Sequence, residues 1–206
     1  MNDDAHPLFR NLLQVCNLAD AEFARGRSVH GARILCGRGC SQCCSQVFQI
    51  TEVEAARISA HVADLPATER ATLQAAARRY VAGRTSLFGG AEAWGQSAPA
   101  GAALPCPALG PEGECTVYEA RPIICRKFGV PIFNPDRPDR VMACELNFKP
   151  GESFADSELV SRQTALYRAQ QQLQAAWNDA GGARSDTPWT IARAILEDAR
   201  TLLPHA

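Results

Sequence analysis

Nine cysteines, eight of them in two groups, constrain this chain more than any other feature of its sequence. The first group is a C-x3-C-x2-C-C string formed by Cys36, Cys40, Cys43 and Cys44. Its two glycines allow tight turns that bring backbone N–H groups near sulfur. The second group lies in a proline-rich stretch and consists of Cys106, Cys115, Cys125 and Cys144. Any fold for this chain must therefore account for eight grouped thiols.

The chemical role of these thiols depends on whether the protein works in a reducing or an oxidising compartment. The amino terminus opens with acidic residues and lacks the basic region and apolar run of a secretory signal, so we expect a cytoplasmic protein. In the reducing cytoplasm disulfides are rare, and clustered thiols more often hold metal or carry out redox chemistry. The alternative is a secreted disulfide framework, which the odd cysteine count and the adjacent pair Cys43-Cys44 disfavour.

Charge and hydropathy argue against several kinds of partner. Lys+Arg 21 and Asp+Glu 22 leave a formal charge of −1, which gives no reason to expect nucleic acid. No stretch approaches the roughly 18 consecutive apolar residues that span a bilayer, so we expect no membrane. A chain of 206 residues can bury a core without cross-links. The expected partner is therefore a metal ion, with an unidentified protein partner left open.

The amino-terminal half contains three expected helices. Apolar residues at three-and-four spacing predict an amphipathic helix over residues 4–24, with Cys16 on its apolar stripe. Thr51 and Glu54 form a T-x-x-E capping box at the start of a second helix. A third helix over residues 67–84 completes a helical hairpin.

The remainder alternates between irregular and helical sequence. Residues 89–105 are rich in Gly, Ala, Ser and Pro and predict a loop, and residues 105–150 are expected to be irregular. Helices are predicted over residues 156–180, ending at two glycines, and over residues 188–203, with Thr187 as N-cap.

These segments predict a mainly α fold: a small helical domain with an irregular, metal-organised cysteine-rich segment. We divide the chain into an N-terminal helix (1–28), a cysteine-cluster metal-binding domain (29–150) and a C-terminal helical segment of the same compact unit (151–206). The sequence contains no Walker loop, H-E-x-x-H or G-x-S-x-G motif, so no catalytic residue is assigned.

The adjacent pair Cys43-Cys44 is informative about the number of metals. Neighbouring side chains point in different directions and cannot easily complete one unstrained tetrahedron. The doublet therefore indicates two metals, a cluster, or one ligand beside one packing cysteine. A helical turn beginning near Cys40 would place it on one face with a residue of the doublet and lower the thiol pKa.

Basic residues and weaker ligands complete the candidate site. Four basic residues lie where they could offset thiolate charge: Arg38, Arg121, Arg126 and Lys127. Most Arg and Lys side chains are simply solvated, and Arg121 and Arg126 are the two that we expect to be exceptions. Cys16 is expected to pack as a small hydrophobe. His30 is a weak alternative ligand, and His6, His61 and His205 are weaker. Tyr118 and Trp94 are expected to pack rather than line a pocket.

The combined pattern C-x3-C-x2-C-C, P-C-P and C-x2-Y-x2-R-P-x2-C-R, followed by a last cysteine, resembles the YkgJ-type cysteine-cluster family. Its members are described as zinc- or iron-chelating. The resemblance covers about residues 36–144 and implies that all eight grouped cysteines are the family's set, with Arg121-Pro122 the adjoining pair. The family usually opens C-x2-C, whereas Cys36 and Cys40 are three residues apart, so the role of Cys36 transfers least securely. Flagellin lysine methylases carry a related cluster, which makes an enzyme conceivable.

Three functions remain open at this point. The first is a module in which zinc holds the irregular segment in place. The second is an iron–sulfur protein acting in electron transfer or as a redox enzyme. The third is a metal or redox sensor that uses thiolates of the loop from Arg38 to Cys44. The cofactor is therefore zinc or iron, the iron in free or cluster form.

Overall fold

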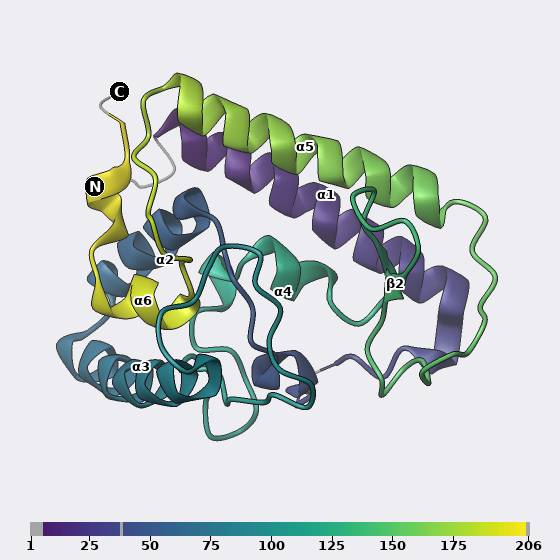
Figure 1. Ribbon diagram of the computed structural model, residues 1–206, viewed down its shortest axis with the longest axis horizontal. Helices are drawn as coiled ribbons and strands as arrows, with labels where there is room; N and C mark the ends of the chain where they lie inside the picture. The colour runs from purple at the N-terminus through teal and green to yellow at the C-terminus, as the bar shows by residue number, and fades with distance from the viewer. Residues whose placement is uncertain (1–5, 38, 205–206) are drawn as a thin grey trace.

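The computed structural model describes residues 6–37 and 39–204. Two long helices, α1 (Pro7–His30) and α5 (Leu159–Asp179), lie side by side and antiparallel along one edge of the molecule (Figure 1). A second group of helices packs below one end of this pair: α2 (Glu52–Asp64), α3 (Ala67–Phe88) and α6 (Ile191–Leu196). The predicted mainly α fold is confirmed.

Helix α1 forms where the apolar spacing predicted it and continues to His30. The first two residues of the predicted range, 4 and 5, lie outside the described residues. The apolar stripe is buried as expected, and its members are Leu8, Leu12, Val15, Cys16 and Ala19. The helix ends at Gly31, whose φ of 55° is readily adopted only by glycine.

The helical hairpin begins with the predicted capping box. The Glu54 carboxylate accepts a hydrogen bond from the Thr51 N–H at 2.8 Å, which satisfies a donor at the start of α2. Helix α3 runs four residues beyond the predicted end at Arg84 and stops at Gly89 in the left-handed conformation.

Helix α5 begins at Leu159 rather than at residue 156, and the Asp156 carboxylate before it accepts hydrogen bonds from Arg25 of α1 at 2.9 and 2.7 Å. The chain leaves the helix through Gly182, whose N–H bonds to the Trp177 carbonyl at 2.9 Å.

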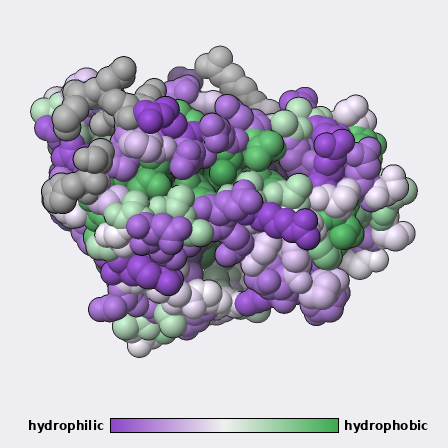
Figure 2. Space-filling model, turned by 90° about the horizontal axis from the view of Figure 1, so that it is seen from above, coloured by the Kyte–Doolittle hydropathy of each residue, from purple (hydrophilic) through white to green (hydrophobic). Residues whose placement is uncertain are grey.

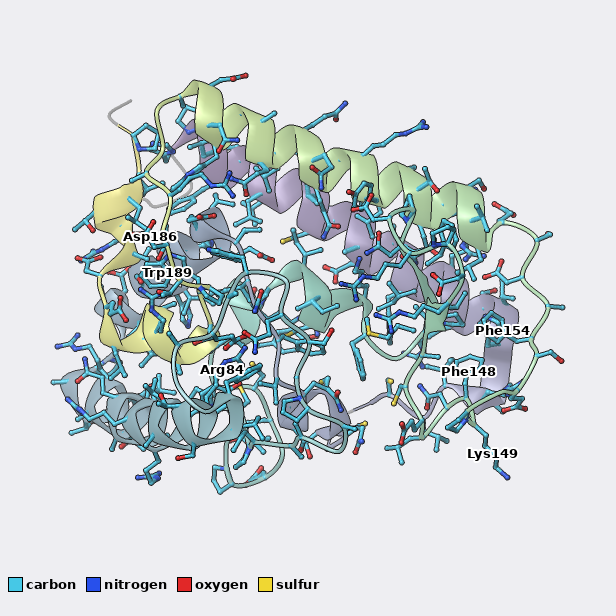
Figure 3. The ribbon with its side chains drawn as sticks, in the orientation of Figure 1. Arg84, Phe148, Lys149, Phe154, Asp186 and Trp189 are labelled. Carbon is cyan, nitrogen blue, oxygen red and sulfur yellow. The ribbon has the colours of Figure 1, made fainter. Side chains whose placement is uncertain are left out.

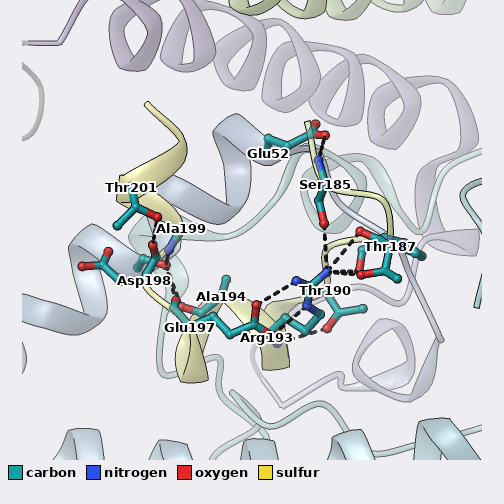
Figure 4. Close-up of polar contacts among 12 residues, drawn as sticks. Glu52, Ser185, Thr187, Thr190, Arg193, Ala194, Glu197, Asp198, Ala199 and Thr201 are labelled. Atoms are coloured by element: carbon teal, nitrogen blue, oxygen red, sulfur yellow. Dashed lines mark hydrogen bonds and ion pairs between the residues drawn. The ribbon is translucent and has the colours of Figure 1, made fainter. Parts of the chain in front are cut away.

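The prediction for the last helix is wrong in its start and its length. Thr190, not Thr187, caps α6 by accepting the Arg193 N–H at 3.1 Å, and the helix is followed only by a 3₁₀ turn, η5 (Ala199–Leu202). The segment before the cap is extended because Ile50 pairs with Trp189. The Arg193 guanidinium binds Thr187 and Glu197 (Figure 4).

One main core lies between α1, α2, α3, α5 and α6. Its largest fully buried side chains include Trp177, Phe9, Ile58 and Val53. Seen from above in the orientation of Figure 2, hydrophilic side chains dominate the surface, with hydrophobic groups showing between them. Within the described ranges no helix combines the length and apolar character needed to cross a membrane.

The central segment contains little regular structure, as predicted. Residues 89–105 form neither helix nor strand. Residues 105–150 contain the 3₁₀ turn η4 (Tyr118–Ala120), the short helix α4 (Ile123–Lys127) and a hairpin of β1 (Ile132–Phe133) and β2 (Val141–Met142). The sequence did not predict the hairpin. Residues of this segment form most of two smaller apolar clusters, one around Val130 and one around Phe128.

Candidate metal centre

The first cysteine group lies on an irregular stretch between α1 and α2. It follows the 3₁₀ turn η2 (Gly31–Arg33) and ends in a second 3₁₀ turn, η3 (Gln42–Ser45), which contains Cys43 and Cys44. The helical turn therefore begins at Gln42, two residues after the position considered from sequence. Arg38 lies outside the described residues.

Backbone hydrogen bonds join the second cysteine group to the first. The Cys106 N–H donates to the Cys44 carbonyl at 2.6 Å, and the Leu104 N–H donates to the Ser45 carbonyl at 3.2 Å. Cys115 is brought back toward Cys106 because the chain pairs Leu109 with Cys115. Segments that are distant in sequence are thus held side by side at the cysteines.

Cys125 lies on α4, which buried polar contacts attach to α1 and α2. The Ile123 N–H donates to the Glu54 carboxylate at 2.7 Å, so the carboxylate that caps α2 also holds the first turn of α4. Arg126 binds Asp20 of α1 at 2.7 Å and also donates to the Arg121 carbonyl at 3.1 Å. These contacts fix the backbone on both sides of Cys125.

Asn147 connects Cys36 with the last part of the second group. Its amide N–H₂ donates to Cys36 Sγ at 3.4 Å and to the Gly129 carbonyl at 2.7 Å, while its oxygen accepts the Leu35 N–H at 3.0 Å. Gly129 has a φ of 120°, and a Cβ there would lie 2.5 Å from Cys36 Sγ. The backbone therefore approaches this sulfur as only glycine allows.

Burial makes most of the thiols weak acids. It raises the pKa of Cys106 to about 12 and is the largest cause of the raised pKa values of Cys36, Cys115 and Cys125. The asparagine hydrogen bond partly opposes this effect at Cys36.

Cys43 is the exception. A hydrogen bond from the Cys44 thiol lowers the pKa of Cys43, and backbone N–H groups and the charge of Arg121 act in the same direction. The same hydrogen bond raises the pKa of Cys44. Cys43 is therefore the most acidic thiol of the doublet, and it is flanked by a cation.

The pKa of a buried cysteine is raised further by the charge of other cysteines close to it. Cys36 is influenced by Cys40, Cys144 and Cys43. Cys125 is influenced by Cys43, Cys106 and Cys115. Cys43 is a neighbour in both cases, so the two sequence groups meet around the doublet.

A family model, CxxCxxCC, described as a putative zinc- or iron-chelating domain, matches residues 35–145. The match covers more than half of the chain and contains all eight grouped cysteines. The chain belongs to the CxxCxxCC family. No curated protein and no solved structure shows significant similarity to it.

The CxxCxxCC region is thus a zinc- or iron-chelating domain, and its donor chemistry fits that description. All nine cysteines are free thiols, and thiolate sulfur is the ligand that zinc and iron centres of this kind use. Among residues 6–37 and 39–204, however, no three His, Cys, Asp or Glu side chains already converge as a metal would require.

Two of the predicted cations, Arg121 and Arg126, have partners other than the cysteines. Arg121 stacks on the Tyr118 ring at 4.2 Å and binds Asp20 at 3.2 Å, while its charge acts on Cys43 and Cys115. Arg126 also donates to Asp20, so this one carboxylate accepts hydrogen bonds from both guanidinium groups. Burial lowers the pKa of Lys127.

The weaker candidates lie apart from the grouped thiols. Cys16 packs in the main core, where burial raises its pKa to about 11. His30 packs edge-on against the rings of Phe148 and Phe154 and lies 3.8 Å from Asp156. Figure 3 shows these two rings near the end of α1. Trp94 donates to the Ser185 carbonyl at 2.8 Å.

Sequence reasoning missed three residues that organise the CxxCxxCC domain. They are Asn147, Glu54 in its second role, and Asp20. The C-x2-N spacing of Cys144 and Asn147 was a usable signal, since an amide near a cysteine group can donate to sulfur. Nothing in the sequence linked Asp20 to Arg126, because the two are 106 residues apart.

A cavity of about 280 Å³ opens beside the domain, between α5 and the start of α2. Its wall includes Gln170, Gln174 and Trp94, together with Ile123 and Ile124 of α4. None of its lining residues is a cysteine, so the cavity adjoins the metal region without forming part of it.

Proposed function

We propose that the grouped thiols bind zinc and that the bound metal holds the irregular segment 105–150 in place. The observation that supports this most strongly is the pairing of Cys106 with Cys44, which gathers the thiols of two distant segments on backbone with little regular structure of its own. The proposed ligands are Cys36, Cys40, Cys43, Cys44, Cys106, Cys115, Cys125 and Cys144.

The segment depends on metal in this proposal because it lacks the regular backbone hydrogen bonds that stabilise the helices. Structural zinc contributes on the order of 10 kcal/mol to folding in small domains. Because zinc binds thiolate, it must displace the protons that buried thiols retain at neutral pH. The apparent affinity should therefore rise as the pH rises.

Within this proposal Arg121 and Arg126 have different tasks. Arg121 offsets thiolate charge near Cys43, and Arg126 positions Cys125 through Asp20. We further propose that the protein works in the reducing cytoplasm, that residues 29–150 form the metal-binding domain, and that its function lies in a surface offered to a protein partner rather than to nucleic acid or membrane.

Metal analysis of anaerobically purified protein tests the proposal directly. We expect colourless protein containing zinc, and we expect chelation to increase amide hydrogen exchange in residues 105–150 while α1 and α5 remain protected. A variant with all eight cysteines changed to Ser should contain no zinc, and Cys16→Ala serves as the matched control. A brown protein with iron and acid-labile sulfide would instead support the iron–sulfur alternative, in electron transfer or redox enzymology.

A second candidate function, a thiol-based metal or redox sensor, is favoured by the Cys43–Cys44 contact. A thiol of lowered pKa next to a second thiol is the arrangement in which peroxide oxidises one sulfur to sulfenic acid and the neighbour condenses with it, releasing water. Substoichiometric peroxide should then release metal and give a disulfide that contains Cys43. Metal retention with all thiols still titratable would rule this function out.

A further inference from the structure

We propose that the eight cysteines form two four-sulfur metal centres that share the Cys43-Cys44 peptide unit, an inference that rests on the proposed function. The core centre consists of Cys44, Cys106, Cys115 and Cys125. The peripheral centre consists of Cys36, Cys40, Cys43 and Cys144. The two centres thus divide the cysteines differently from the two groups in the sequence.

The core centre is assembled by backbone contacts. The Cys44 carbonyl accepts the Cys106 N–H at 2.6 Å, and the Leu109–Cys115 pairing returns the chain to Cys106. Cys106 and Cys115 both pack against the main hydrophobic core. Cys125 has Cys43, Cys106 and Cys115 as thiol neighbours. Cys44 also has Cys106 and Cys115 as neighbours, so with its backbone bond to Cys106 it is the residue of the first sequence group that joins three of the second.

The peripheral centre is assembled around Asn147 and the Phe128 cluster. Cys43 and buried Cys144 pack against the same small cluster, which includes Phe128 and Ile132. Cys36 has Cys40, Cys43 and Cys144 as its thiol neighbours. One residue of the second sequence group therefore joins three of the first.

The doublet explains why two centres lie next to each other. Two adjacent cysteines cannot easily both complete one unstrained tetrahedron, so Cys43 and Cys44 suit two centres better than one. A hydrogen bond joins the two thiols, and it opens when each sulfur joins its own centre.

The two centres differ in how well the protein shields them. Cys106 and Cys115 of the core centre pack against the main core. In the peripheral centre, Cys36 packs against the small cluster of Ile34, Val130 and Phe148, and Cys144 is buried in the small Phe128 cluster. Exposed apolar side chains flank the peripheral centre, with Leu35 at 63% and Leu146 at 54% exposure. We therefore expect the peripheral centre to exchange its metal first.

Chelation of the zinc-loaded, full-length protein tests this division. We expect two zinc ions per chain, lost in two phases that differ in rate by at least about tenfold. Pulsed alkylation during release should label Cys36 and Cys144 in the fast phase and Cys106, Cys115 and Cys125 in the slow phase. Trypsin separates these cysteines, because Cys36, Cys144 and the three core cysteines fall on three different peptides.

Paired variants provide a second readout. The double variant Cys36→Ser, Cys144→Ser should retain one ion and lose the fast phase, and Cys16→Ala should retain both ions. One zinc ion per chain, or release in one phase with simultaneous labelling of all peptides, would overturn the two-centre inference while leaving zinc binding intact. Absence of any metal from the wild-type protein would instead overturn the proposed function itself.

Discussion

The helical frame and the cysteine segment of this protein are stabilised in different ways. In the frame, α1 and α5 bury largely apolar faces against the core, and caps such as Thr51 and Thr190 satisfy the helix ends. In the segment from Pro105 to Pro150, small clusters and single side chains such as Asn147 and Glu54 hold an irregular backbone. The frame should therefore be stable without metal, and the segment should depend on it.

The largest effect is expected for the frame. Trp177→Ala removes a fully buried side chain from the main core and should lower the free energy of unfolding by about 4 kcal/mol. The loss should be equal with zinc and with chelator, measured by urea unfolding. Gln172→Ala, at an exposed position of the same helix, should change stability little. A Trp177 effect seen only with metal would break the distinction between the two regions.

Glu54→Gln tests a side chain that serves both regions. The carboxylate accepts hydrogen bonds from Thr51 and Ile123, and an amide cannot accept with both of its heavy atoms. We expect a loss of about 3 kcal/mol and faster zinc release, since α4 carries Cys125. Exposed Glu69→Gln is the control. Unchanged zinc release would show that α4 is held by metal alone.

Asp156→Asn probes the junction of α1 and α5. Loss of the paired contact with Arg25 should cost about 2 kcal/mol at pH 7. Arg25 holds the pKa of Asp156 below its ordinary value of 3.8, so this stabilisation is present above that pH and is lost as the pH falls through the lowered pKa. The difference in the free energy of unfolding between variant and wild type should therefore disappear in acid.

The pH dependence is best measured by urea unfolding in chelator, so that thiol protonation does not contribute. Burial also lowers the pKa of His30 from 6.5, which adds a separate loss of stability as the pH falls below that value. Glu158→Gln, in an exposed ion pair nearby, should have almost no effect. A gap that widens below pH 3.8 would contradict the assignment.

The smallest effect concerns the cap of α6. Thr190→Ala should cost about 1 kcal/mol because it removes the acceptor for the Arg193 N–H. Thr187→Ala removes only an exposed contact with the Arg193 guanidinium and should cost less. Thermal unfolding of both variants makes the comparison, and a larger effect at Thr187 would mean that the helix begins earlier.

Local pattern predicted the frame well because its signals are contained in short windows. The apolar stripe of α1 and the Thr51–Glu54 box needed no tertiary information. The start of α6 was mispredicted because the pairing of Trp189 with Ile50, far away in the sequence, keeps the residues before Thr190 extended.

Sequence also identified the eight grouped cysteines but not how they are divided. Their spacing predicts thiolate chemistry, whereas the neighbours of Cys144 depend on Phe128, Ile132 and Cys43 packing together. Likewise, the link from Asp20 to Arg126 depends on how α4 docks on α1. Contacts of this kind are set by tertiary packing and leave no local signature.

The α2–α3 hairpin has a consequence for the order of assembly. It lies between Cys44 and Cys106 in the chain, and its folding brings Ser45 beside Leu104. The chain therefore loses the entropy of closing that long loop when the hairpin folds, before any ion binds. Metal loading should consequently be a late and fast event, whose rate follows the supply of zinc rather than the search of an unfolded chain for its ligands.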